Sequence, residues 1–264
     1  MRILTLGPKG TFSEVACENY IKKSKSNYEV VFFTSFFDVI NNLKESDVAI
    51  LPFENSTDGF IQQTLDLIYY NSLYIIKTIN VDVHYQLVSN NPLDFNEPLY
   101  VQFTAVNQTS KFIYNNKLYM QVLTESNTNS LLRLKESKKG QAIIPSHIKT
   151  NYKYVYNNIE DNYNNQTRFV VLCKDVNKVT GTINKATIFV EFNEDKSGML
   201  YDLLSFFKVH DINITAIVSR PNRKRNNAYY FFLELDIHDK KIIELIKTFS
   251  EANSSYDIKI AGLY

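Results

Sequence analysis

The sequence predicts an α/β protein with a two-lobed N-terminal part and a separate βαββαβ unit at the C-terminal end. Short apolar runs alternate with helical periodicity through residue 175, and after residues 175–185 the pattern becomes strand, helix, strand, strand, helix, strand. Alternation of strands and helices is typical of an α/β sheet. The chain has 264 residues, which is enough for two domains with cores of their own.

The first lobe is predicted from three apolar strand patterns separated by helical ones. Strands are expected at residues 2–7, 28–35 and 46–53, with a helix from about Ser13 and a second helix after Thr34. That second helix carries its apolar residues at helical spacing, namely Phe36, Val39, Ile40 and Leu43.

A long extended stretch at residues 73–90 leads into the second lobe. Strands are expected at residues 99–103, 119–124 and 141–146. One helix between them carries Val106, Thr109, Phe112 and Ile113, and another runs through Leu131 and Leu134. Two such lobes enclose a cleft, which is where small-molecule sites tend to lie.

The C-terminal unit is predicted to have the ferredoxin-like split βαββαβ order. Strands are expected at residues 186–192, 212–220, 228–237 and 257–263, and helices at 197–211 and 240–253. Residues 220–227, "RPNRKRNN", join two of these strands; we interpret them as a solvated hairpin loop, with phosphate binding as the alternative.

Composition excludes several classes of protein. Charged residues make up 22% of the chain, hydrophobic residues 44%, and the net charge is +1, so we expect a soluble globular protein that binds neither nucleic acid nor membranes. Cys17 and Cys173 lie in apolar patterns and are predicted to be buried free thiols. With no leader or membrane-spanning pattern in the sequence, we expect a cytoplasmic protein.

Polar residues recur in the turns that follow the predicted strands. The first such turn, "LGPKGTFSE", contains Thr11 and Ser13 but has neither the phosphate-loop nor the dinucleotide-binding spacing. Each turn alone is explained by a helix cap, yet together they suit a small, oxygen-rich anion, because such turns gather at one end of an α/β sheet. The other polar turn residues are Glu54, Asn55, Ser56, Thr57, Thr104, Ser126, Asn127 and Thr128.

Metal-dependent and nucleophilic chemistries have no motif in this chain. The four histidines are widely separated, with no zinc-binding spacing, and no nucleophile elbow or catalytic cysteine signature is present. We therefore expect chemistry that needs no metal and no cofactor.

An ordered set of motifs resembles the prephenate dehydratase family with its regulatory ACT domain. The set is "GPKGTFSEVA", "ILPFENSTDGF" followed by "TLDL", "IED" followed by "NQTRFVVL", and then "SGML" and "VSRP". The resemblance implies a periplasmic-binding-protein-like catalytic domain over residues 1–178, with lobes at about 1–78 plus 160–178 and about 79–159. It implies an ACT domain over residues 184–264.

The resemblance also implies the reaction and its residues. The reaction is the decarboxylative dehydration of prephenate to phenylpyruvate in phenylalanine biosynthesis, catalysed by a carbon–oxygen lyase. The family's motifs place catalytic residues at Thr167, Arg168, Asn55 and Gln108, with the Thr167 hydroxyl directed at the departing hydroxyl group. Substrate-binding positions fall on Thr11, Glu54, Ser56 and Phe169.

In the C-terminal unit, the resemblance implies that phenylalanine binds as an allosteric effector in a homodimer or a dimer of dimers. The implied effector-binding residues are Gly198, Met199, Leu200, Ser219, Arg220 and Pro221. Two other functions stay open at this point: a non-aromatising prephenate decarboxylase, because the family's Ser-His-Pro segment is absent before Gln108, and a non-catalytic sensor of small anions.

Overall fold

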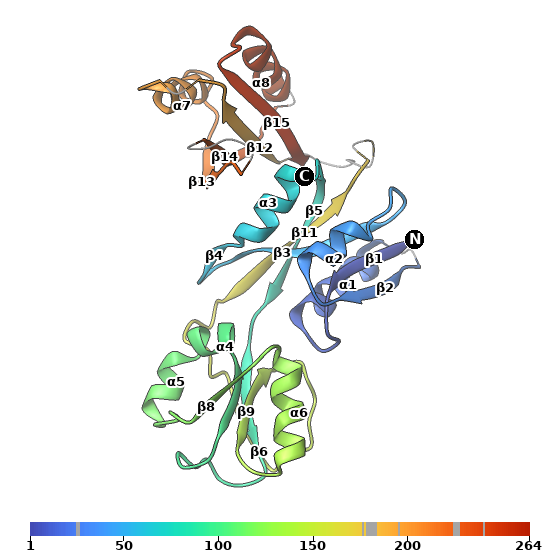
Figure 1. Cartoon of the computed structure of the whole chain (residues 1–264), viewed down its shortest axis with the longest axis vertical. Helices are drawn as coiled ribbons and strands as arrows, with labels where there is room; N and C mark the ends of the chain where they lie inside the picture. Colours follow the sequence, from blue (N-terminus) through green and yellow to red (C-terminus); the bar gives the residue numbers. More distant parts are fainter. Residues whose placement is uncertain (25–26, 176, 178–183, 195, 224–227, 240) are drawn as a thin grey trace. The chain divides into compact units, whose positions relative to one another are not determined.

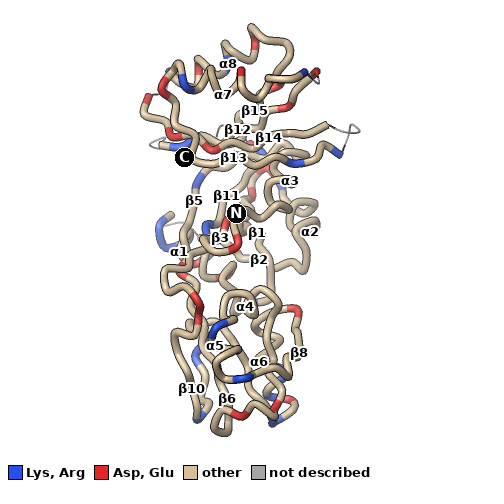
Figure 2. The backbone as a smooth tube through the Cα atoms, turned by 90° about the vertical axis from the view of Figure 1, so that its left-hand side faces the viewer, with Lys and Arg blue, Asp and Glu red and all other residues tan. Residues whose placement is uncertain are grey.

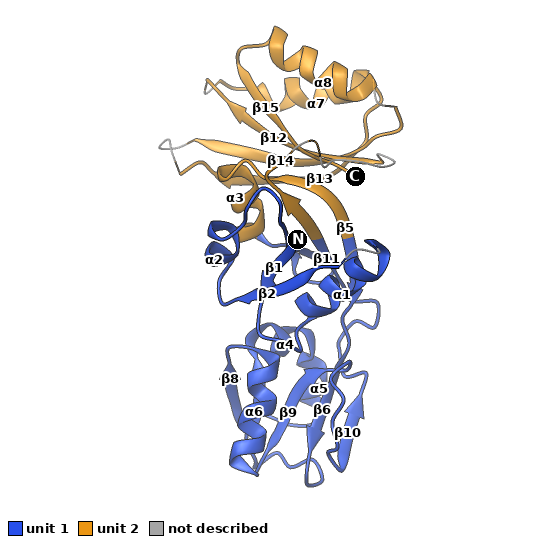
Figure 3. Cartoon of the chain, turned by 90° about the vertical axis from the view of Figure 1, so that its right-hand side faces the viewer, with its two compact units in different colours: residues 1–61, 79–169 blue, residues 62–78, 170–264 orange. Residues whose placement is uncertain are grey.

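The computed structural model describes residues 1–24, 27–175, 177, 184–194, 196–223, 228–239 and 241–264. The chain divides into two compact units, the first made of residues 1–61 and 79–169 and the second of residues 62–78 and 170–264 (Figure 3). Most of the predicted linker, residues 178–183, and part of the Arg- and Lys-rich loop, residues 224–227, lie outside the described residues.

The first sheet of unit 1 confirms the three predicted strands. β1 (Arg2–Leu6) pairs in parallel with β2 (Glu29–Phe33) and β3 (Val48–Asn55), and the short β4 (Gly59–Phe60) folds back on the end of β3. α1 (Phe12–Ser24) and α2 (Phe36–Asn41) connect the strands (Figure 1). The apolar runs form strands because β1 and β3 are buried on both faces, which parallel sheets require.

The second sheet of unit 1 has the strand order β10-β6-β9-β7-β8. Its elements are β6 (Tyr85–Ser89), β7 (Leu99–Gln102), β8 (Gln121–Thr124), β9 (Gln141–Pro145), β10 (Tyr154–Asn157) and α6 (Asn127–Ser137). The extended stretch at residues 73–90 forms two strands, β5 (Tyr74–Asp82) and β6. They are separated at Val83, whose N–H donates to the carbonyl of Asn165 at 2.8 Å.

The prediction of one helix through Val106 and Ile113 is wrong. Two short helices, α4 (Phe103–Gln108) and α5 (Ser110–Asn115), meet at Thr109, where φ is −128°. The carboxylate of Asp161 accepts the backbone N–H groups of Ser110 and Lys111 at 3.0 and 2.9 Å and so caps α5. The break leaves Gln108 at the end of α4.

Unit 2 confirms the predicted βαββαβ order. β12 (Lys185–Phe192), α7 (Met199–Val209), β13 (Ile214–Pro221), β14 (Tyr229–Asp236), α8 (Lys241–Ala252) and β15 (Tyr256–Leu263) follow one another. The sheet order is β13-β14-β12-β15, with β5 next to β15 through the pair Ile75 and Gly262. β5 and β11 (Gln166–Cys173) each begin in one unit and end in the other.

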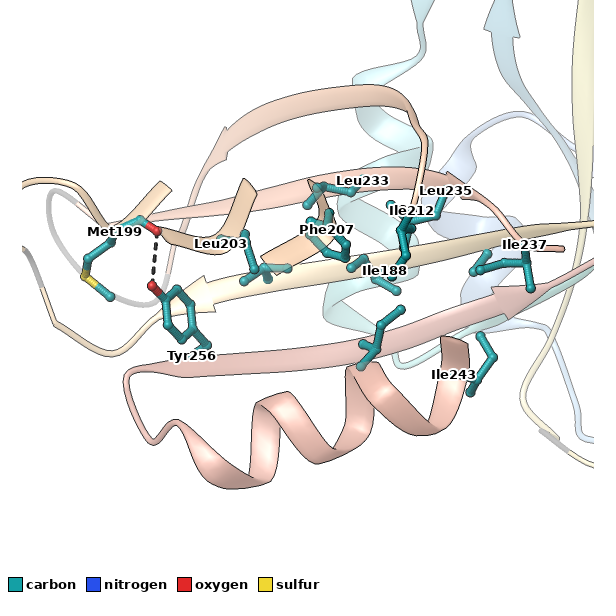
Figure 4. Close-up of a cluster of buried hydrophobic side chains, with 13 residues drawn as sticks. Ile188, Met199, Leu203, Phe207, Ile212, Leu233, Leu235, Ile237, Ile243 and Tyr256 are labelled. Carbon is teal, nitrogen blue, oxygen red and sulfur yellow. Dashed lines mark hydrogen bonds between the residues drawn. The ribbon is translucent and has the colours of Figure 1, made fainter. Parts of the chain in front are cut away.

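The two faces of this sheet are covered differently. α7 and α8 pack on one face over a core that includes Ile188, Leu203 and Leu233, and the hydroxyl of Tyr256 donates to the carbonyl of Met199 (Figure 4). On the other face lies α3 (Gln62–Tyr70), where the ring of Tyr69 stacks on that of Tyr230 at 3.9 Å between centroids. Unit 2 therefore includes residues 62–78, which the sequence-based limits place in the first lobe.

Further predictions concern the cysteines and the charged residues. Cys17 and Cys173 are free and buried, as predicted. Lys and Arg residues, and Asp and Glu residues, are scattered along the backbone of both units (Figure 2). No helix in the described part of the chain combines the length and apolar character needed to cross a membrane.

Candidate active site

The end of β3 and the start of β11 bring two predicted catalytic residues together. The side-chain amide of Asn55 donates to the Oγ1 atom of Thr167 at 3.0 Å. Asn55 is 6% exposed, and Thr167 is partly exposed. A buried amide thus contacts the hydroxyl group of a partly exposed residue.

The orientation of the Asn55 amide is fixed by the turn that follows it. Its Oδ1 atom accepts the backbone N–H groups of Thr57 and Asp58 at 2.9 and 3.1 Å. An Asx turn of this kind holds the oxygen toward the backbone, so the Nδ2 group must face β11. This local geometry explains why the sequence has Asn at this position, because an aspartate would lack the donor.

Asn165 links the residues on either side of the site. Its Oδ1 atom accepts from Asn55 Nδ2 at 2.9 Å and from Ser56 Oγ at 3.1 Å, and its Nδ2 group donates to Gln108 Oε1 at 3.0 Å. Asn165 is 2% exposed. Both polar atoms of this buried side chain are therefore satisfied by predicted site residues.

Gln108 belongs to the same network through a second bond. Its Nε2 group donates to the carboxylate of Asp58 at 2.6 Å, and its backbone carbonyl accepts from Asp161 N–H at 2.8 Å. Asp161 of the "IED" segment thus bonds to Gln108, the last residue of α4, and caps α5. The side-chain amide groups of Asn55, Gln108 and Asn165 thus form one network, in which each donor described above meets an acceptor.

Arg168 follows Thr167 in β11, so its side chain leaves the strand on the opposite side. Its guanidinium group contacts the Glu54 carboxylate at 2.7 Å and lies over the rings of Phe53 and Phe60, 5.1 and 5.7 Å from their centroids. The ring of the bulky Phe60 thus helps to hold the guanidinium group of Arg168 in place.

The remaining predicted substrate-binding residues are placed differently. The hydroxyl of Thr11 donates to the Pro8 carbonyl within its own turn at 3.0 Å. Phe169 is 2% exposed, so its ring is part of the core. Ser56 donates to Asn165, as described above.

Some of the polar turns do gather around one hollow. A cavity of about 630 Å³ is lined by the first turn at Gly7 and Pro8, by Thr34, and by the start of α6 at Ser126 and Thr128. Ser126 also caps α6, because its Oγ atom accepts the N–H of Asn129. Thr104 bonds only locally in the structure described, to Gln102. The polar turns therefore divide between helix capping, this hollow and the Asn165 network.

Burial shifts the pKa of a thiol and of a phenol near these elements. Burial raises the pKa of the Cys17 thiol to about 12, so this residue is no nucleophile at neutral pH. Burial also raises the pKa of Tyr85, whose backbone N–H donates to Glu160. Among the residues that the structure describes, no group of three or more His, Cys, Asp and Glu side chains is placed to hold a metal ion.

The predicted effector-binding residues all lie in unit 2. Gly198 precedes α7 with φ of 92°, a left-handed conformation that favours glycine. Met199 is 6% exposed and contributes to the core. Ser219 and Pro221 are exposed on β13, whereas Arg220 is bonded to α3.

Sequence reasoning missed Asn165, Asp58 and Asp161. Their signals were weak, because Asn165 belongs to an asparagine-rich run and the two aspartates sit in turns. Asn165 is two positions before Thr167, however, so both side chains leave an extended segment on the same side. That spacing is the signal by which Asn165 could have been found.

The fold and this network define a two-lobed α/β protein whose site is built mainly from amide and hydroxyl groups, followed by a ferredoxin-like unit. The chain belongs to the prephenate dehydratase family, whose model matches residues 3–177. The family predicted from the sequence motifs is thereby confirmed.

A relative matched over nearly its whole length agrees with this membership, and two solved structures share the fold. A prephenate dehydratase of Methanocaldococcus jannaschii is 29% identical over 265 residues, covering 97% of this chain and 95% of that protein. The prephenate dehydratase from Arthrobacter aurescens, solved in complex with L-Phe, gives a TM-score of 0.81 at 22% identity, covering 100% of this chain and 90% of that one. The enzyme from Staphylococcus aureus gives 0.78 at 23% identity, with 100% of both chains covered.

Proposed function

We propose that the chain catalyses the conversion of prephenate to phenylpyruvate. In this reaction the bond from the ring to one carboxylate breaks and releases CO2, and the electron pair of that bond enters the ring. The ring then expels its hydroxyl group, which leaves as water after taking up one proton. The product ring is aromatic, so the catalyst mainly has to assist the departing hydroxyl group.

The observation that carries this proposal is the hydrogen bond from Asn55 to Thr167. Because the Thr167 oxygen accepts a hydrogen bond, its own O–H becomes a stronger donor. A fixed donor that strengthens its bond as negative charge develops on a leaving oxygen stabilises the transition state. Thr167 acts here as a donor within a relay that solvent re-protonates, since a threonine hydroxyl is itself a weak acid.

Asn165 serves as a positioning residue in this proposal. It holds Asn55 and Gln108 in one orientation, and their amide groups are polar without adding negative charge to the site. Placement of this kind keeps reacting groups close to the productive geometry. Gln108 and Ser56 are the remaining groups of the network that we assign to the substrate side.

Arg168 braces the site by holding Glu54. The ion pair and the two aromatic rings occupy its guanidinium group, and the strand directs that group away from the Thr167 side. Arg168 therefore stabilises the hairpin that carries Asn55. Its positive charge also offsets the carboxylate of Glu54 next to a site for a dianionic substrate.

We further propose that the βαββαβ unit is a regulatory ACT domain that binds phenylalanine and joins copies of the chain into a dimer or a dimer of dimers. Support comes from the sheet order, in which β13 lies at one edge, and from exposed apolar residues such as Ile217 on β13 and Tyr201 on α7. Light scattering measures the molar mass of the purified protein in solution. A monomer at all concentrations contradicts the proposed dimer or dimer of dimers.

Product analysis tests the proposed reaction. Purified protein is incubated with prephenate, and the product is identified by its ultraviolet absorption and mass. Phenylpyruvate with one equivalent of CO2 supports the proposal. A decarboxylated product that keeps its hydroxyl group identifies a non-aromatising decarboxylase, and thermal stabilisation by prephenate without turnover identifies a sensor.

A further inference from the structure

Asp66 of α3 is a buried carboxylate at the centre of a cluster of charged and polar side chains in unit 2. Its two carboxylate oxygens accept from Arg220 Nε at 3.0 Å and from Arg220 Nη2 at 2.8 Å. Arg223 donates to Oδ2 at 2.7 Å, and the hydroxyl of the fully buried Tyr230 donates to Oδ1. Asp66 itself is 7% exposed.

Arg220 has its whole guanidinium group engaged with α3. In addition to the two bonds to Asp66, its Nη1 group donates to Gln62 Oε1 at 2.6 Å. A planar, bidentate contact of this kind fixes direction as well as distance. Arg220 therefore links the edge strand β13 to the helix.

The neighbour of Arg220, Ser219, points to the other face of the sheet. Ser219 pairs in register with Phe231, which packs against the core under α7, whereas Arg220 pairs with Tyr230, which contacts Asp66. Of the residues predicted to bind the effector, Ser219 lies on the α7 face and Arg220 on the α3 face. β13 thus carries Ser219, a residue of the proposed effector site, on one face and Arg220, which is bonded to α3, on the other.

α3 also continues directly from the hairpin of the candidate site. Asn55 pairs with Gly59, and Glu54 with Phe60, in the β3–β4 hairpin. The N–H of Ile61 donates to the Phe53 carbonyl at 2.8 Å, and α3 begins at the next residue, Gln62. The chain therefore runs from the hairpin that carries Asn55 into α3 without an intervening loop.

We propose that the Asp66–Arg220 pair is the coupling contact that transmits effector binding on β13, through α3, to the hairpin carrying Asn55. This inference rests on the proposed function, because it concerns regulation of the same site. Arg220 is then a coupling residue and makes no contact with the effector.

The burial of the pair is what makes it suited to this role. A carboxylate that is removed from water and loses its partner is strongly destabilised, so Asp66 follows the guanidinium group when β13 shifts. The Asp66–Arg220 contact is therefore either made or broken, with few geometries between. An element that couples two conformations of a protein needs this property. An exposed ion pair would stretch or exchange with water instead.

The test uses Asp66→Asn in the full chain, with Asp236→Asn as the matched control. Asp236 lies on β14 and is also paired, to Lys185 at 3.3 Å and to Asn213 at 2.7 Å, in contacts separate from α3. Phenylalanine binding is measured by calorimetry, prephenate turnover with and without phenylalanine by product formation, and amide hydrogen exchange over residues 53–70 by mass spectrometry.

We expect the wild type and Asp236→Asn to respond to phenylalanine with a change in turnover of at least about fivefold. We also expect their exchange over residues 53–61 to change on phenylalanine binding. Asp66→Asn binds phenylalanine with affinity within about threefold of the wild type, but both responses are lost. Arg220→Lys, which keeps the charge and loses the planar contact, gives the same result and replaces Asp66→Asn if that variant does not fold.

Several results overturn the inference. If Asp66→Asn binds phenylalanine and responds to it like the wild type, the pair has no coupling role. If Asp66→Asn or Arg220→Lys no longer binds phenylalanine, the pair belongs to the effector site instead. A wild type that converts prephenate without any response to phenylalanine refutes the coupling and leaves the proposed reaction intact. If prephenate is not converted, the exchange measurement alone tests the coupling. Phenylalanine must then change the exchange of residues 53–61 in the wild type and leave it unchanged in Asp66→Asn; any other result refutes the coupling.

Discussion

The amide nitrogen of Asn55 lies 3.0 Å from the Oγ1 atom of Thr167, and the two residues come from the ends of different strands. Asn55 cannot turn away, because its own oxygen is held by the backbone of Thr57 and Asp58. The bond therefore has a fixed direction, from the amide to the hydroxyl. Thr167 is left with its hydroxyl hydrogen as the group to offer to a substrate.

Replacing Asn165 by alanine should lower kcat by about 100-fold, because Asn55 and Gln108 lose their shared partner and the site loses its geometry. The free energy of unfolding should fall by about 1–3 kcal/mol, since buried amide groups are left unsatisfied. Steady-state kinetics and chemical denaturation measure the two effects.

Asn164→Ala is the control for that variant, because Asn164 is the exposed neighbour of Asn165. It should retain the kcat and the stability of the wild type. An Asn165→Ala protein with wild-type kcat contradicts the positioning role, whatever its stability.

Glu54→Gln and Arg168→Gln should have similar effects on kcat/KM, and the double variant should be no worse than either single one. If Arg168 acts through Glu54, removing either partner removes the same brace, so the effects are not additive. A double-mutant cycle in kcat/KM measures this. An Arg168→Gln variant that raises KM many times more than Glu54→Gln does would instead place Arg168 on a substrate carboxylate.

The stabilising effect of Asp66 should disappear in acid. Burial alone raises the pKa of Asp66, but hydrogen bonds from Arg220 and Tyr230 and the charges of Arg220 and Arg223 outweigh it and hold the pKa below its usual range. The folded pKa lies below the unfolded value of about 3.9, so the contribution is complete well above that pH and is lost as the pH falls through the folded value.

Urea denaturation of the wild type and Asp66→Asn at several pH values measures this effect. At neutral pH the wild type should be more stable by about 3 kcal/mol or more, because the variant leaves two guanidinium groups with a neutral partner. The difference should shrink below about pH 4. A difference that is constant between neutral pH and pH 3 contradicts the assignment of the charge to Asp66.

Periodicity predicted most of the fold because the buried faces of the elements repeat at regular spacing. The βαββαβ unit is the clearest case: the helix predicted at residues 197–211 is present as α7, and it buries Met199, Leu203 and Phe207, which recur at helical spacing. The break at Thr109 was not predictable in this way. It depends on the Asp161 carboxylate, which comes from a distant part of the sequence.

The candidate site was predicted only in part, and from motifs. Motifs identified Asn55, Gln108 and Thr167; in the structure Asn55 is bonded directly to Thr167 and is linked to Gln108 through Asn165. Whether these residues act as proposed stays a prediction. Arg220 shows what a motif omits, because "VSRP" names the residue but not the strand face on which its guanidinium group lies.

The most direct test of the account is the rate of phenylpyruvate formation from prephenate by the wild type, Thr167→Ser and Thr167→Ala. The wild type should form phenylpyruvate, Thr167→Ser should keep turnover within about tenfold because the hydroxyl remains, and Thr167→Ala should lose about 100- to 1000-fold in kcat. Unfolding transitions of the three proteins should coincide. Full turnover by Thr167→Ala, or no phenylpyruvate from the wild type, contradicts the account.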